Sequence, residues 1–104
     1  MYALKTLPEF DAWFTKLKDP ITRARLIRRL EKAAQGLLGD CASVGEDVEE
    51  MREFFGPGWR MYYIRQGNTL IIMLGGGSKA TQRQDIKHAK TLARQLKASL
   101  DEAP

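Results

Sequence analysis

The chain contains very little of what metal centres and nucleophilic enzymes usually need. Its 104 residues include one cysteine, Cys41, and one histidine, His88. A single cysteine excludes an internal disulfide framework and is typical of a reducing compartment. Because there is no Cys/His pair, no Ser/His/Asp set and no clustered metal-ligand spacing, we expect neither a metal nor a cofactor. We expect Cys41 to lie in a loop without a chemical role, and His88 to lie on a helix surface.

Long apolar runs are also absent. No run approaches the ~20 residues of a membrane span, and the start Met-Tyr-Ala-Leu-Lys has no signal-peptide pattern. We therefore expect a cytoplasmic protein that does not enter the membrane. The hydrophobic share of 43% is ordinary for a globular protein, and the length suffices for one hydrophobic core. The sequence predicts one domain that spans residues 1–104.

Charge is distributed unevenly along the chain, whose net charge is +4. Residues 40–53 hold six acids against one base, which leaves 16 of the 17 bases and 7 of the 13 acids elsewhere. A basic body attracts polyanions, and nucleic acid is the commonest polyanion in a cell. The alternative partner is an acidic segment of another protein.

Two helices are predicted near the N-terminus, after a first strand over residues 2–7. The first begins at Pro8 and buries an apolar, largely aromatic stripe of Phe10, Trp13, Phe14 and Leu17. Asp19 before Pro20 predicts the N-terminus of a second helix, which ends near Ala34. Much of its outer face is basic: Arg23, Arg25, Arg28, Arg29 and Lys32. That face is either simply solvated or meets a nucleic acid or an acidic partner.

The second half of the chain predicts three strands and a last helix. Residues 38–47 are expected to form a loop, and residues 48–55, 58–65 and 69–74 to form an antiparallel meander. Gly75–Gly77 predicts a sharp turn, and Thr81 with Gln84 fits a capping box that opens an amphipathic helix. The predicted class is α+β: a small, mainly antiparallel sheet of order β-α-α-β-β-β-α, with a helix hairpin on one face. The other face would stay partly open.

A tight reversal at Gly56-Pro57-Gly58 would place two arginines side by side. If the turn is centred on Gly56, Arg52 pairs with Arg60, and side-chain alternation puts Tyr62 on the same face. Adjacent guanidinium groups repel each other unless an anion lies between them, and guanidinium binds phosphate bidentately. The alternative is that each arginine pairs with a nearby acid. Nearby acids that could do so include Glu50, Glu53 and Asp47.

Lys79 follows the glycines at the end of the apolar strand, near the hairpin if the two strands are neighbours. The segment Gly-Gly-Gly-Ser-Lys lacks the spacing of a nucleotide-phosphate loop, so we exclude that motif. A cluster of Arg52, Arg60 and Lys79 instead suits cleavage of RNA through its own 2′-hydroxyl. The substrate supplies the nucleophile, and the protein orients it, stabilises the added negative charge and helps protons move.

Two segments of the chain carry a resemblance to a known family. They are Met51-Arg-Glu-Phe followed by Gly-Pro-Gly-Trp-Arg-Met-Tyr-Tyr, and Leu-Ile-Ile-Met-Leu-Gly-Gly-Gly-Ser-Lys-Ala-Thr-Gln-x-x-Asp-Ile-Lys-x-Ala. Together they resemble the RelE/ParE superfamily, most closely the HigB-like (Gp49-like) addiction module killer toxins. The similarity covers roughly residues 2–96.

This resemblance implies the toxin of a type II toxin–antitoxin system. Toxins of the RelE and HigB kinds are endoribonucleases (mRNA interferases) that cleave mRNA, usually on the ribosome, and so inhibit translation. A cognate antitoxin, commonly a helix-turn-helix protein in the HigB-like branch, holds them inactive. By motif, the implied catalytic residues are Arg52, Arg60 and Lys79, and we take Tyr62, Arg65 and Arg83 as candidate substrate-binding residues. Family members often have a further catalytic group near the C-terminus, where this sequence predicts a helix.

Two other functions remain open from the sequence. ParE-like members of the superfamily inhibit DNA gyrase without cleaving nucleic acid. A third possibility is a non-toxic module that binds nucleic acid or an antitoxin.

Overall fold

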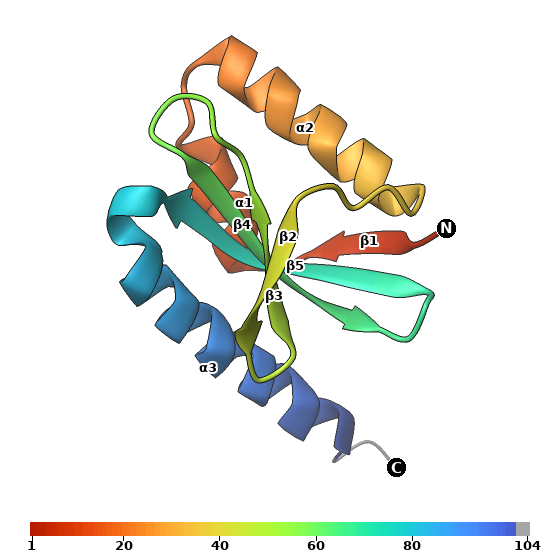
Figure 1. Cartoon of the computed structure of the whole chain (residues 1–104). Helices are drawn as coiled ribbons and strands as arrows, with labels where there is room; N and C mark the ends of the chain where they lie inside the picture. The colour runs from red at the N-terminus through yellow and green to blue at the C-terminus, as the bar shows by residue number, and fades with distance from the viewer. Residues whose placement is uncertain (102–104) are drawn as a thin grey trace.

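Five strands and three helices make up residues 1–101, which the computed structural model describes (Figure 1). The strands are β1 Ala3–Thr6, β2 Cys41–Gly45, β3 Val48–Arg52, β4 Trp59–Gln66 and β5 Leu70–Ser78. The helices are α1 Pro8–Thr15, α2 Pro20–Ala34 and α3 Gln82–Asp101, and a 3₁₀ turn, η1 Lys79–Thr81, directly precedes α3. The predicted order is confirmed apart from one added strand, β2.

The strands form one mixed sheet in the order β1-β5-β4-β3-β2. β1 pairs in parallel with β5, and every other neighbouring pair is antiparallel. The apolar run in β5 is buried on both faces, as expected of a central strand: Ile71 and Met73 belong to one core cluster, Ile72 and Leu74 to the other. The chain therefore folds as a small α+β protein.

Helices cover both faces of the sheet. Phe10 of α1 and Leu26 of α2 pack on one face, in the cluster that contains Met61 and Tyr63. α3 packs on the opposite face, where Leu92 joins the second cluster. The expectation that this second face stays partly open is wrong. The apolar stripe of α3 has to be buried, and the face left free by α1 and α2 is where it packs (Figure 1).

The segment predicted as a loop contains β2, which forms a hairpin with β3. The turn residues Glu46 and Asp47 have φ of 54° and 65°, values that usually require glycine or asparagine. Neither central position holds glycine or asparagine, although Gly45 precedes them with a φ of 102°, so the sequence signal for a hairpin is weak. Both turn residues form exposed ion pairs with α3: Glu46 with Arg94 at 2.8 Å and Asp47 with Lys97 at 2.6 Å.

The three glycines lie inside β5 and do not form the predicted turn. A Cβ at position 76 would overlap the indole ring of Trp13, and one at position 77 would overlap the carboxylate of Asp85. Glycine is therefore required here because α1 and α3 approach the strand closely from its two sides.

Replacing Gly76 with alanine should lower the free energy of unfolding by about 1–3 kcal/mol, because Trp13 would have to move. Gly75→Ala on the adjacent residue is the matched control, since a methyl group there would have no other atom within 4 Å. Urea unfolding of both variants measures the difference. Equal losses in the two variants would show that close packing on Trp13 is not the reason for glycine at position 76.

Helix starts are only partly as predicted. Asp19 caps α2 and accepts hydrogen bonds from the backbone and hydroxyl of Thr22, at 3.3 and 2.8 Å. The capping box at the other end of the chain is formed by Ser78 and Thr81 around η1, and not by Thr81 and Gln84. This places η1 and Lys79 directly at the end of β5.

Candidate functional site

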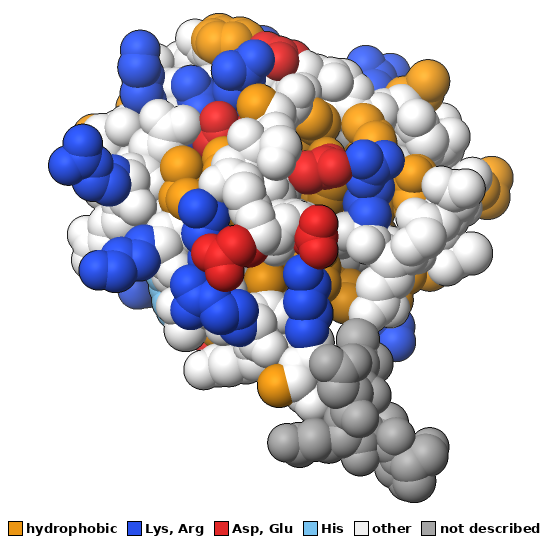
Figure 2. Space-filling view, turned by 60° about the horizontal axis from the view of Figure 1, so that its bottom comes forward, with side chains coloured by type: hydrophobic (Ala, Val, Ile, Leu, Met, Phe, Trp, Pro, Cys, Tyr) orange, Lys and Arg blue, Asp and Glu red, His pale blue; other side chains and the backbone are white. Residues whose placement is uncertain are grey.

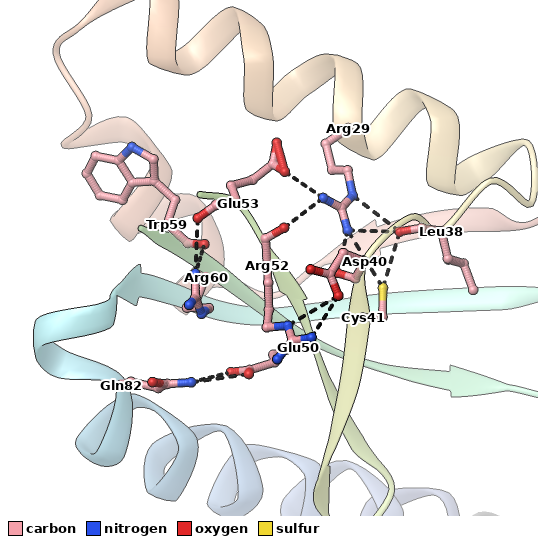
Figure 3. A network of polar contacts seen from close by, with 10 residues as sticks. All are labelled: Arg29, Leu38, Asp40, Cys41, Glu50, Arg52, Glu53, Trp59, Arg60 and Gln82. Carbon is pink, nitrogen blue, oxygen red and sulfur yellow. Dashed lines mark hydrogen bonds and ion pairs between the residues drawn. The ribbon is translucent and has the colours of Figure 1, made fainter. Parts of the chain in front are cut away.

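The predicted pairing of the two arginines is confirmed. Arg52 of β3 and Arg60 of β4 are register partners, as the symmetric turn about Gly56 requires. Figure 3 shows both guanidinium groups on the side of the sheet that α3 covers. Glu50 lies on the same side and is the register partner of Tyr62. Strand alternation thus gathers two arginines and one carboxylate at the hairpin end of the sheet.

Arg60 is buried, with 5% of its surface exposed. Its Nη1 donates to the carbonyl oxygens of Glu53 and Trp59, each at 3.0 Å, while its Nε is buried without a partner. The guanidinium also lies 5.6 Å from the ring centre of Phe54, which is 72% exposed. Within residues 1–99, whose side chains are described, no carboxylate forms an ion pair with Arg60. The side chain therefore stabilises the turn while keeping its charge uncompensated by an acid.

Arg52 has an acidic partner, but not one that its sequence neighbours suggested. Its Nε and Nη2 both donate to one carboxylate oxygen of Asp40, at 3.3 and 2.8 Å. This hydrogen bonding raises the pKa of the Arg52 guanidinium. Both side chains are more than one third exposed, and exposed ion pairs contribute little and exchange partners readily. An incoming anion can therefore replace Asp40.

The three acids considered as partners for the arginines are engaged elsewhere. Glu50 accepts from Nε2 of Gln82 on both carboxylate oxygens, at 3.1 and 2.9 Å, and is 4% exposed. Glu53 pairs with Arg29, and Asp47 with Lys97.

Lys79 lies beside Arg60 around Gly58. A methyl group on Gly58 would lie 3.4 Å from Cβ of Lys79 and 3.6 Å from Nη1 of Arg60. The backbone amide of Lys79 donates to the carbonyl oxygen of Gly58 at 2.8 Å, which fixes the end of β5 against the hairpin turn. The side chain is exposed and, among the described residues, has no ion-pair partner. Arg83 follows one helical turn later and is also exposed.

Two of the predicted substrate-binding residues do not join this cluster at the surface. Tyr62 is fully buried under α3, so the expectation that it stands on an open face is wrong. Burial, with the nearby charges of Glu50 and Asp85, raises the pKa of its hydroxyl above the usual value. Arg65 lies five residues along β4 from Arg60, where it pairs with Glu49 at 2.6 Å. Hydrogen bonds with Tyr2 and Glu49 raise the pKa of Arg65.

The acidic segment of the chain is largely neutralised by the basic body. Five of its acids form ion pairs, four of them with bases outside the segment: Asp40–Arg52, Glu46–Arg94, Asp47–Lys97, Glu49–Arg65 and Glu53–Arg29. Figure 2 shows one face of the molecule, where Lys and Arg side chains surround a few Asp and Glu. The acids thus dock β2 and β3 onto the rest of the chain, and we assign them no metal. Within residues 1–101 no three His, Cys, Asp or Glu side chains gather closely enough to hold one.

Comparison with known proteins gives a relative but no activity. No family model matches the chain, and no solved structure matches it. A protein of Haemophilus influenzae, described as an uncharacterized protein, is 41% identical over 93 residues. These residues are 89% of this chain and 94% of that protein. The chain belongs to the same family as this Haemophilus protein.

Because the relative carries no stated activity, the function of this family has to be argued from the site. No helix in the described part of the chain is long and apolar enough to cross a bilayer. What the site offers is a set of cations at one end of the sheet: Arg60 held in place, Arg52 with a replaceable partner, and Lys79 exposed. Such a set can bind a phosphate and stabilise added negative charge on it.

Sequence reasoning did not identify the contacts that three residues make in this site. Asp40 binds Arg52 from the start of the segment expected to be a loop. The side-chain alternation that placed Arg60 on one face of the sheet also predicts Glu50 on that face, which α3 covers. Arg29 of α2 bonds both ends of the hairpin segment, to the carbonyl of Arg52 and the carboxylate of Glu53 (Figure 3). Nothing in the local pattern of α2 distinguishes Arg29 from its basic neighbours.

Proposed function

We propose that this chain is a HigB-like toxin of the RelE/ParE superfamily and that it cleaves mRNA in the cytoplasm, which inhibits translation and growth. The two family-like segments support the proposal, because they contribute the cationic cluster described above. The fold class also agrees with it, since the resemblance implies an α+β fold in which helices pack against a small, mainly antiparallel sheet.

The observation that carries the proposal is the environment of Arg60. A buried charge without an opposite charge costs free energy, and here two carbonyl oxygens offset only part of that cost. The cost falls when an anion binds beside the guanidinium. Arg52 on the neighbouring strand and Lys79 at Gly58 make the same end of the sheet attractive to a phosphate.

In the proposed reaction the 2′-oxygen of the RNA attacks the adjacent phosphorus, and the 5′-oxygen of the next nucleotide leaves. Arg60 and Arg52 would stabilise the extra negative charge on the phosphorane, and exposed Lys79 would bind the scissile phosphate. Glu50 is the carboxylate on the same side of the sheet, but it is 4% exposed and both its oxygens accept from Gln82, so water is our candidate to accept the 2′-proton and to protonate the leaving 5′-oxygen. Tyr62 is a poor candidate because its hydroxyl is buried and its pKa raised.

The proposal implies two kinds of partner. A cognate antitoxin, of helix-turn-helix type, would hold the toxin inactive, and mRNA, usually on the ribosome, would be the substrate. A small helix-turn-helix reading frame beside the gene is therefore expected.

Primer extension on a reporter mRNA after induction, with and without translation, tests the proposal. We expect new 5′ ends within minutes of induction, and cleavage only during translation would indicate action on the ribosome. Intact mRNA with relaxed plasmid DNA and DNA damage would instead identify a gyrase inhibitor. Harmless overexpression with intact mRNA would identify a non-toxic binding module.

A further inference from the structure

A groove beside α2 has cations with no acidic partner. The groove has a volume of about 780 Å³ and lies between α2 and residues 36–39. Arg25, Arg28 and Lys32 line it at helical spacings of three and four, so they form one stripe on α2. All three are exposed, and none forms an ion pair with a described side chain of residues 1–99.

The one acid in the wall of this groove is already neutralised. Glu53 pairs with Arg29 at 2.6 Å, and their side chains are 20% and 10% exposed. A ligand in the groove therefore contacts three cations without acidic partners and the Arg29–Glu53 ion pair, whose charges cancel. The groove thus favours a polyanion.

The groove reaches the β3–β4 hairpin at Glu53, the first residue after β3, and Arg60 lies on β4 beyond the turn. The guanidinium of Arg25 lies 3.8 Å from the ring centre of Phe55, and Figure 1 shows the β3–β4 turn beside α2. The next aromatic, Phe54, is 72% exposed and lies over Arg60. Two cation–aromatic contacts, Arg25 with Phe55 and Arg60 with Phe54, thus lie between the groove and the candidate catalytic arginines.

We infer that this surface, which we call the α2 track (Arg25, Arg28, Lys32 and Phe54), binds single-stranded RNA next to the cleavage site. A cationic groove combined with an exposed aromatic platform is the combination that single-stranded nucleic acids need. The cations bind backbone phosphates, and Phe54 stacks on a base beside Arg60. An acidic protein segment is the competing occupant, but it would leave the exposed ring of Phe54 without a matching partner. The inference rests on RNA being the substrate, as proposed above.

The test uses a fluorescent 12-nucleotide 2′-O-methyl oligouridylate, which lacks the 2′-hydroxyl and so cannot be cleaved through it. Fluorescence anisotropy between 50 and 300 mM salt gives the affinity and its salt dependence. Each phosphate contact on a single strand contributes a slope of about 0.7 in log K against log salt. In the variant R25Q/R28Q/K32Q, the slope of log K against log salt should therefore be about 2 units less steep than in the wild type. The affinity at 0.1 M salt should fall on the order of 100-fold.

A charge-matched control removes three exposed lysines outside the track, K5Q/K18Q/K87Q. It should change affinity by less than about 3-fold, because only long-range attraction is lost at this salt. Phe54→Ala should weaken binding about 10-fold with no change in slope, since stacking releases no counterions.

Equal losses in the track variant and the control would overturn the α2 track and leave the nuclease proposal standing. So would unchanged RNA binding in the track variant together with lost binding to a 12-residue oligoglutamate, which would identify an acidic protein segment. Absence of RNA binding by the wild-type chain also overturns the track. The primer-extension result then decides the proposed function separately, because it depends on cleavage in cells.

Discussion

Arg60→Ala should abolish growth arrest and lower mRNA cleavage by about 100- to 1,000-fold, the usual effect of removing one donor that stabilises a transition-state charge. Arg60 is the part of the cationic cluster that cannot move away, because two carbonyl oxygens and the ring of Phe54 hold it. Arg60→Lys keeps the charge but loses the forked donors, so we expect it to recover only part of the activity. Toxicity on induction and primer extension measure both variants.

The control for this experiment is Arg94→Ala. Arg94 lies on α3 and forms an exposed ion pair with Glu46 of the β2–β3 turn, so this variant loses the same charge outside the site. It should remain fully toxic. Because Arg60 also bonds the turn, its loss should cost about 1–3 kcal/mol of stability, and thermal unfolding of the purified variants has to confirm that they are folded. A folded Arg60→Ala variant with undiminished toxicity would show that this arginine serves the turn alone.

The register of the β3–β4 hairpin was predictable because one short signal determines it. Gly56-Pro57-Gly58 fixes the centre of the turn, and the pairing of Arg52 with Arg60 follows from symmetry. The start of α2 was predictable for a similar reason, since Asp19 and Pro20 act within one turn of the helix. Both features depend on residues that are close together in the sequence.

The environment of the arginines was not predictable, because it depends on contacts between distant segments. Asp40 reaches Arg52 through the pairing of β2 with β3, and the two central residues of the β2–β3 turn, Glu46 and Asp47, are neither glycine nor asparagine. Arg60 is buried because α3 covers this face, although the amphipathic pattern of α3 gives only its buried stripe and not the face it packs on. The sequence thus placed the arginines correctly and could not assign their partners.

Arg29 connects more separate parts of the chain than any other side chain near the site. Its Nη2 donates to the carbonyls of Leu38 and Asp40, at 3.0 and 2.7 Å, and its Nη1 donates to the carbonyl of Arg52 at 3.0 Å. It also pairs with Glu53 at 2.6 Å, with only 10% of the arginine side chain exposed. One guanidinium on α2 therefore fixes the start of β2 and the end of β3.

Arg29→Ala should lower the free energy of unfolding by about 3 kcal/mol, because it leaves Glu53 largely buried without a partner and removes hydrogen bonds to three carbonyl oxygens. That is a large share of the ~5–15 kcal/mol that usually stabilises a domain. Urea unfolding measures the loss. Arg28→Ala, one residue away and exposed, is the matched control and should stay within about 0.5 kcal/mol of the wild type.

Glu53→Gln separates the two contributions of Arg29, since it removes the ion pair and leaves the arginine on its three carbonyls. If the carbonyl bonds dominate, Glu53→Gln should cost less than half as much as Arg29→Ala. A loss as large as that of Arg29→Ala would show that the ion pair alone holds α2 to the hairpin. Because Arg29 donates to the backbone carbonyl of Arg52, Arg29→Ala should also lose mRNA cleavage at temperatures where the variant is still folded. Cleavage equal to that of the wild type at such a temperature would show that the site does not depend on this hydrogen bond.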